Sequence, residues 1–108
     1  MLSILDIPLS EILIDPAAVS ENISCHAARQ GGLAVTGIGV VNDRLLVFFE
    51  PAAGPVPVYR VAPMEGVSAA EIIGEVRSRW GASFSTVGIF HCGSSLWGLF
   101  RHKGDEAI

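Results

Sequence analysis

Two stretches of the sequence decide the fold: GIGVVNDRLLVFFE at residues 37–50 and GIFHCGSSLWGLFR at residues 88–101. Each has two runs rich in β-branched and aromatic residues around a group of turn residues, which is typical of a β-hairpin. The turns, Asn42-Asp43 and Cys92–Ser95, coincide when the second stretch is shifted by 51 positions. The same shift aligns four identical residues: Gly37 with Gly88, Ile38 with Ile89, Leu45 with Leu96, and Phe49 with Phe100. The sequence therefore predicts an internal repeat.

A helix is expected before each hairpin. The first begins at Asp15-Pro16, because aspartate caps backbone N–H groups and proline lacks the N–H that has no partner at the first helical position. Glycines at 31 and 32 predict its end, and its buried stripe is Val19, Ile23 and Ala27. The second helix begins with a capping box at Ser68–Glu71 and ends at Gly81. Its apolar face is expected at Ile72, Ile73, Val76 and Trp80.

A short apolar run comes before each helix, at Ile12–Ile14 and Val56–Val61. The element order is then β-α-β-β, twice, and predicts an α+β fold: a mostly antiparallel sheet with two helices on one face. In architecture alone this order resembles the ferredoxin-like and dimeric α/β-barrel modules. We expect one domain over residues 1–108, with repeat units at about 10–50 and 56–102 and a disordered tail at 104–108.

The composition favours a homo-oligomer, with a dimer as the simplest form. Half of the residues are apolar and 17% are charged, against about 25% charged in ordinary domains. The hairpin strands also carry apolar residues on both faces, whereas a sheet with one solvated face alternates apolar and polar residues. We therefore expect the second face to meet another subunit, a ligand or the other half of a closed barrel.

Charge and cysteine content argue against several protein classes. The net charge is −4, with −4 in residues 1–54 and zero in residues 55–108, and no basic stripe suggests nucleic-acid binding. No apolar run reaches the ~18 residues of a membrane span, and no basic region precedes the apolar N-terminus as in a secretory signal. Two cysteines form no disulfide framework, so reduced thiols in the cytoplasm are expected.

The cysteines and histidines form no catalytic or metal-binding motif. Cys25-His26 and His91-Cys92 together have the right atoms for zinc, but adjacent residues of a helix or strand point apart and cannot chelate. We expect Cys25 to be buried and Cys92 to lie in a turn, with no metal, cofactor or catalytic residue. A thiol beside His91 leaves a small enzyme as an alternative.

A ligand site, if present, is expected near the second hairpin and the strands that flank it. Arg60 and Arg101 are candidates for binding a carboxylate or phosphate in a cleft between the repeats, although a solvated surface paired with glutamates is the simpler interpretation. The predicted ligand-binding residues are Arg60, His91, Cys92, Trp97 and Arg101. The main functional hypothesis is a small non-catalytic oligomerising module, such as a regulatory or assembly subunit. The alternatives are an anionic-metabolite-binding domain and a small enzyme that uses His91 and Cys92.

Overall fold

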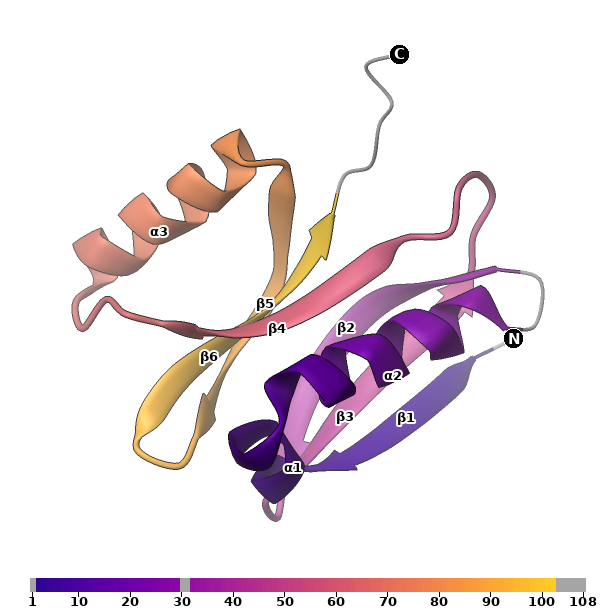
Figure 1. Cartoon of the computed structure of the whole chain (residues 1–108), viewed down its shortest axis with the longest axis horizontal. Helices are drawn as coiled ribbons and strands as arrows, with labels where there is room; N and C mark the ends of the chain where they lie inside the picture. The colour runs from indigo at the N-terminus through magenta and orange to yellow at the C-terminus, as the bar shows by residue number, and fades with distance from the viewer. Residues whose placement is uncertain (1, 30–31, 103–108) are drawn as a thin grey trace.

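The computed structural model describes residues 2–29 and 32–102 and has an α+β fold. The strands form two separate three-stranded antiparallel sheets, with orders β1-β3-β2 and β4-β6-β5 (Figure 1). The tail predicted at residues 104–108 lies outside the described part of the chain. In order, the elements are β1 (Ser3–Pro8), α1 (Leu9–Ile14), α2 (Pro16–Ala28), β2 (Leu33–Val41), β3 (Arg44–Pro51), β4 (Val58–Met64), α3 (Ala69–Gly81), β5 (Phe84–Cys92) and β6 (Ser95–His102).

Both predicted hairpins form, and they share one register. The β2–β3 turn has positive φ at Asn42 and Asp43, 49° and 63°, as the two-residue turns that match the twist of a hairpin require. Every residue pair of β2–β3 recurs 51 residues later in β5–β6. The correspondence includes an irregularity of the same kind, between Val35 and Gly37 in one hairpin and between Thr86 and Gly88 in the other.

The start and the buried stripe of α2 are confirmed. The Asp15 carboxylate accepts a hydrogen bond from the backbone N–H of Ala18 at 3.1 Å. The three residues predicted to be buried are buried: Val19, Ile23 and Ala27. The helix ends at Ala28, before the predicted glycines, of which Gly31 is outside the described residues.

The capping box of α3 is confirmed, but its apolar face is not buried. Ser68 and Glu71 cap each other's backbone N–H groups. No side chain of α3 is fully buried, and Ile73 and Trp80 are 50% and 58% exposed. The reason is that α3 packs mainly on β5, whereas α2 lies between the first sheet and β4 (Figure 1).

Removal of the α3 cap should destabilise the helix in a pH-dependent way. The N–H groups of Val67 and Ser68 and the Ser68 hydroxyl lower the pKa of Glu71. Because the folded pKa lies below the unfolded value of about 4.3, the stabilisation is complete above that pH and is lost as pH falls through the folded pKa. We expect Ser68→Ala to lower the free energy of unfolding by about 1 kcal/mol at pH 7. Urea titrations at pH 7 and pH 3 test this; an equal loss at both pH values would contradict the role of the Glu71 charge.

Two predictions about the strands are wrong. Ile12–Ile14 is the end of α1, not a strand: Leu9 and Ile12, three residues apart, form the buried side of this helix. The strand that pairs with the first hairpin is β1, which lies before the expected start of the first unit near residue 10.

The single sheet with two helices on one face is the second error. The strands form two sheets because β4 pairs with β6 along one edge and bonds to side chains of α2 along the other, so that none of the described strands of the first sheet pairs with it. Helix α3 accordingly packs on the second sheet alone, whereas α2 contacts β1 and β2 of the first sheet and β4 of the second.

One hydrophobic cluster joins the two halves. It contains Val47 and Phe49 from the first sheet, Val61 and Leu99 from the second, and side chains of α1 and α2. Ile38 of β2 packs directly against Gly88 of β5, where an added Cβ would lie 2.5 Å from the Ile38 Cδ1 atom. The inner face of each sheet therefore contributes to a shared core.

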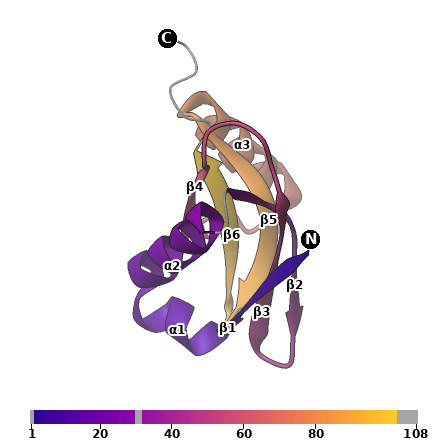
Figure 2. The ribbon, with the colours of Figure 1, turned by 90° about the vertical axis from the view of Figure 1, so that its right-hand side faces the viewer.

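The outer faces of the two sheets differ. On the second sheet, α3 lies over the outer face, with the Arg79 guanidinium 4.2 Å from the centre of the Phe100 ring. Among the described residues, no helix covers the outer face of the first sheet, since α1 and α2 lie on its other side (Figure 2). We call this surface the open sheet face; its residues are Ile4, Asp6, Gly37, Gly39, Val41, Leu46 and Phe48. None of the helices described is long and apolar enough to cross a lipid bilayer.

Candidate functional site

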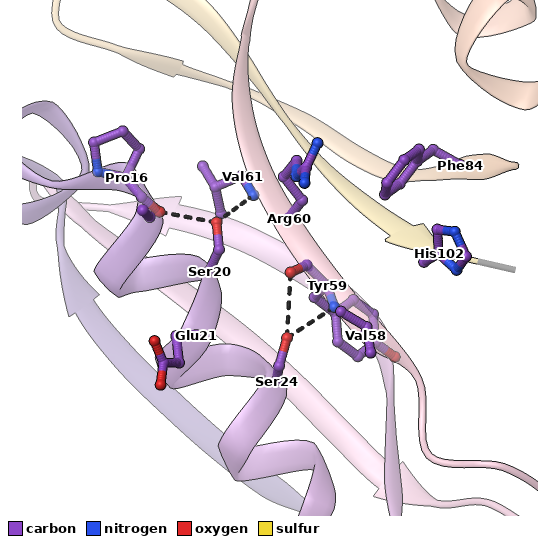
Figure 3. A pocket seen from close by; sticks show the side chains of 11 residues that line it. Pro16, Ser20, Glu21, Ser24, Val58, Tyr59, Arg60, Val61, Phe84 and His102 are labelled. Atoms are coloured by element: carbon purple, nitrogen blue, oxygen red, sulfur yellow. Dashed lines mark hydrogen bonds between the residues drawn. The ribbon is translucent and has the colours of Figure 1, made fainter. Parts of the chain in front are cut away.

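A groove between α2 and β4 is the candidate ligand site of the described chain. It encloses about 810 Å³ and lies between the two halves (Figure 3). We call it the α2–β4 groove; its lining residues are Pro16, Ala17, Ser20, Glu21, Ser24, Val58, Tyr59, Arg60, Val61, Phe84 and His102. One wall is helical, and the other comes from three strands of the second sheet.

At the base of the groove, two serines of α2 accept hydrogen bonds from the edge of β4. Ser24 accepts from the backbone N–H of Tyr59 at 2.9 Å, and Ser20 accepts from that of Val61 at 2.8 Å. Pro63, the next residue in this alternation, has no N–H to donate. The N–H groups on the free edge of β4 are therefore hydrogen-bonded to side chains of α2, which protects this edge from pairing with another strand.

Charge and aromatic groups meet at one end of the groove. The Arg60 guanidinium lies 5.1 Å from the centre of the Phe84 ring, and the His102 ring packs edge-on against Phe84 at 4.9 Å (Figure 3). Glu21 lies on the helical wall. Because Arg60 is exposed, its charge is available to an anionic group of a ligand whose apolar part contacts Val58 and Phe84.

Tyr59 connects the groove to the first half of the chain. Its hydroxyl accepts the backbone N–H of Val35 at 2.8 Å, next to the irregularity in β2. Burial raises the pKa of Tyr59, while the Val35 bond and the charge of Arg101 act in the opposite direction. The phenol therefore acts as a neutral structural link between the two sheets.

The two predicted arginines do not converge. Arg60 lines the groove. Arg101 lies directly opposite Tyr59 in the β4–β6 ladder, so its side chain is on the other face of the sheet from that of Arg60. His91 is also outside the groove, beside the start of α3, where it lines a separate depression with Ser68 and Ile72.

Cys92 and Trp97 are core residues. The Cys92 thiol is 1% exposed and donates to the Leu9 carbonyl at 3.4 Å, and burial raises its pKa. Trp97 is 8% exposed, and its indole Nε1 makes no hydrogen bond among the described residues. Since His91 is exposed and Cys92 is buried, adjacent positions of β5 point apart, as the sequence indicated. The structure does not bring a thiol–imidazole pair together.

The predicted locations of the two thiols are wrong in both cases. Cys25 is exposed, and Cys92 is the buried last residue of β5 rather than part of the turn. Cys25 follows the buried Ile23 by two positions, which places it about 200° around the helix. Within residues 2–29 and 32–102, no three His, Cys, Asp or Glu side chains gather in a way that suits a metal ion.

Alkylation should distinguish the two cysteines. We expect iodoacetamide to modify Cys25 at the rate of an ordinary exposed thiol, while Cys92 stays unmodified in the folded chain because it is buried and its pKa is raised. Peptide mass spectrometry after brief labelling measures this directly, and labelling in urea provides the control in which both react. Equal labelling of both thiols in the native protein would show that the β5–β6 turn opens readily.

Several groove residues were not predicted from the sequence, among them Ser20, Ser24, Glu21, Phe84 and His102. The available signal was the four-residue spacing of Ser20 and Ser24, which places two hydroxyls on one side of α2 beside its buried stripe. Comparison of the chain with protein-family models, curated proteins and solved structures found no significant match.

Proposed function

We propose that this chain is a small non-catalytic module that self-associates through its open sheet face. The observation that carries the proposal is the difference between corresponding faces of the two sheets. In the ladders, Ile4 opposite Phe48 corresponds to Val61 opposite Leu99. Val61 is 4% exposed because the first half of the chain covers it, whereas Ile4 is 52% exposed.

The same difference holds at the other edge of the sheet. Val41, at the end of β2, is 54% exposed, and its counterpart Cys92 is 1% exposed. An uncovered apolar sheet face of this kind is typical of a protein interaction surface. The corresponding face of the second sheet is buried inside the same chain. This burial supports a protein surface, rather than solvent, as the environment of the open sheet face.

The shared register of the two hairpins supports a duplicated unit as the origin of this arrangement. In this proposal each unit is a three-stranded sheet with a helix on one face, and one unit docks on the other. The likeness to ferredoxin-like or dimeric α/β-barrel modules remains an architectural prediction. A cytoplasmic location, in which the exposed Cys25 would stay reduced, also remains a prediction.

A charge on the open sheet face tests the proposal. Ile4→Arg should reduce the sedimentation coefficient to that of a monomer, since a desolvated guanidinium has no partner in an apolar contact. Ile14→Arg is the matched control, because Ile14 is 82% exposed and lies on α1, away from the face. Identical sedimentation of wild type, Ile4→Arg and Ile14→Arg at tens of micromolar would count against this surface.

A second candidate function is binding of a small anionic molecule in the α2–β4 groove. The specific observation is the exposed Arg60 guanidinium held against Phe84 within a groove between the two halves. A thermal-shift screen with dicarboxylates and phosphate monoesters tests it, with Arg60→Gln as the variant and Arg101→Gln as the control on the opposite face. Absence of stabilisation of the wild type, or equal stabilisation of both variants, would exclude a role for Arg60.

A further inference from the structure

We infer that the partner of the open sheet face is the α3–β5 face of a second copy, so that the copies associate head to tail. The α3–β5 face consists of Ile73 and Arg77 on α3 and Ile89 on β5. This inference rests on the self-association proposed above and specifies its geometry. Its basis is that the chain already contains one contact of this type, between its own two halves.

The contact between the two sheets contains a pair of residues that fit together. Within the chain, Ile38 of β2 packs on Gly88 of β5, and an added Cβ at Gly88 would be 2.5 Å from Ile38. In the shared register of the two hairpins, Ile38 corresponds to Ile89 and Gly88 corresponds to Gly37, so the equivalent pair is Ile89 and Gly37. Ile89 is 40% exposed, and an added Cβ at Gly37 would meet only Phe48, at 3.8 Å. Both members of a second such pair are therefore accessible, on the faces of β2 and β5 that point away from the Ile38–Gly88 contact.

The edge strands β4 and β1 show a second correspondence. Ser20, five residues after the N-cap Asp15, contacts β4 at Val61. The position five residues after the N-cap of α3 is Ile73, and the counterpart of Val61 is Ile4. These two residues are 50% and 52% exposed. A head-to-tail contact would bring two apolar side chains together where the internal contact uses a serine and a backbone N–H.

The charge distribution favours this arrangement over a symmetric one. A symmetric dimer through two open sheet faces would place the half-chains with a net charge of −4 against each other, with Glu50 and the Asp6–Arg44 ion pair on both sides. A head-to-tail contact places that half against residues 55–108, whose net charge is zero and which present Arg77 on α3. Opposed like charges are unfavourable at an interface.

Such a contact joins two different surfaces and leaves one of each unfilled on a two-copy complex, where a further copy can bind. It therefore produces rings or open chains of copies instead of a closed two-fold dimer. Two variants can therefore test the contact, one that disrupts the open sheet face and one that disrupts the α3–β5 face. Gly37→Leu fills the site for Ile89 on the open sheet face, where an added Cβ meets only Phe48, at an ordinary contact distance of 3.8 Å. Ile89→Asp removes the residue that enters it.

The test is the mass of each variant and of their mixture by light scattering, with circular dichroism and thermal unfolding to establish that each variant is folded. We expect wild type to exceed 11.4 kDa, each variant alone to have the monomer mass of 11.4 kDa, and the equimolar mixture to form a 1:1 complex. The complex forms because Ile89→Asp keeps an intact open sheet face and Gly37→Leu keeps an intact α3–β5 face.

The other outcomes separate the two levels of the proposal. If Gly37→Leu is monomeric but Ile89→Asp keeps the wild-type mass, the open sheet face pairs with something other than the α3–β5 face, and the head-to-tail inference is wrong while self-association stands. The same conclusion follows if both variants and their mixture remain monomeric. Monomeric wild type at every concentration would overturn both. An unfolded Ile89→Asp would be replaced by Ile73→Asp, a helix-surface variant with the same expected result.

Discussion

Replacing Ser20 and Ser24 together by alanine should lower the free energy of unfolding by about 2–4 kcal/mol, because a buried donor left without its acceptor costs about 1–3 kcal/mol. These hydroxyls accept the N–H groups of Tyr59 and Val61 on the edge of β4. Both bonds are part-buried, so water replaces only some of what is lost. The effect should exceed that of an ordinary surface substitution, which is within about 0.5 kcal/mol.

Urea unfolding followed by circular dichroism measures this loss. Ser78→Ala, an exposed serine on α3, is the matched control and should change the free energy of unfolding little. The double variant should also aggregate more readily, since β4 would then present unpaired N–H groups to other chains. If the double variant were as stable as the control, the serines would not be what satisfies this edge.

Gly88→Ala should destabilise the chain by about 1–3 kcal/mol, the usual cost of overpacking a core. The new Cβ would lie 2.5 Å from Cδ1 and 2.7 Å from Cγ1 of Ile38, so β2 and β5 must separate or Ile38 must leave its rotamer. The corresponding Gly37→Ala meets only Phe48 at an ordinary contact distance of 3.8 Å. It should be neutral or stabilise by about 0.4–1 kcal/mol through loss of backbone freedom in the unfolded chain.

Both glycine variants should be compared by urea unfolding in the Ile4→Arg background, so that self-association does not contribute to stability. The two substitutions are chemically identical and occupy corresponding positions of the two hairpins. A difference between them therefore reports the contact between the halves alone. Equal stabilities would mean that Ile38 moves aside without cost and that the sheets are not tightly packed there.

The sequence predicted the local elements well because their signals are local. Asn42-Asp43 between two apolar runs specifies a hairpin turn, and Ser68 with Glu71 specifies a helix start; both formed as expected. The division into two sheets was not predictable in the same way. It depends on two serine hydroxyls of α2 reaching β4, a contact between residues 35 and 41 positions apart.

The site residues show the same limit. Alternation along β5 correctly separated His91 from Cys92, because side-chain direction along a strand depends only on the period of two. Whether a thiol is buried depends on what packs against it, so Cys25 and Cys92 were placed wrongly. The position of Arg101 opposite Tyr59, on the other face from Arg60, required the register of β4 with β6, which neither strand's sequence determines by itself.

The measurement that tests self-association most directly is a dilution series of the unaltered chain by light scattering. We expect a weight-average mass above 11.4 kDa at tens of micromolar, which falls toward that value on dilution as the open sheet face is released. Added salt should not abolish the association, because the contacts at Ile4 and Gly37 are apolar. A mass of 11.4 kDa at every concentration would contradict the account.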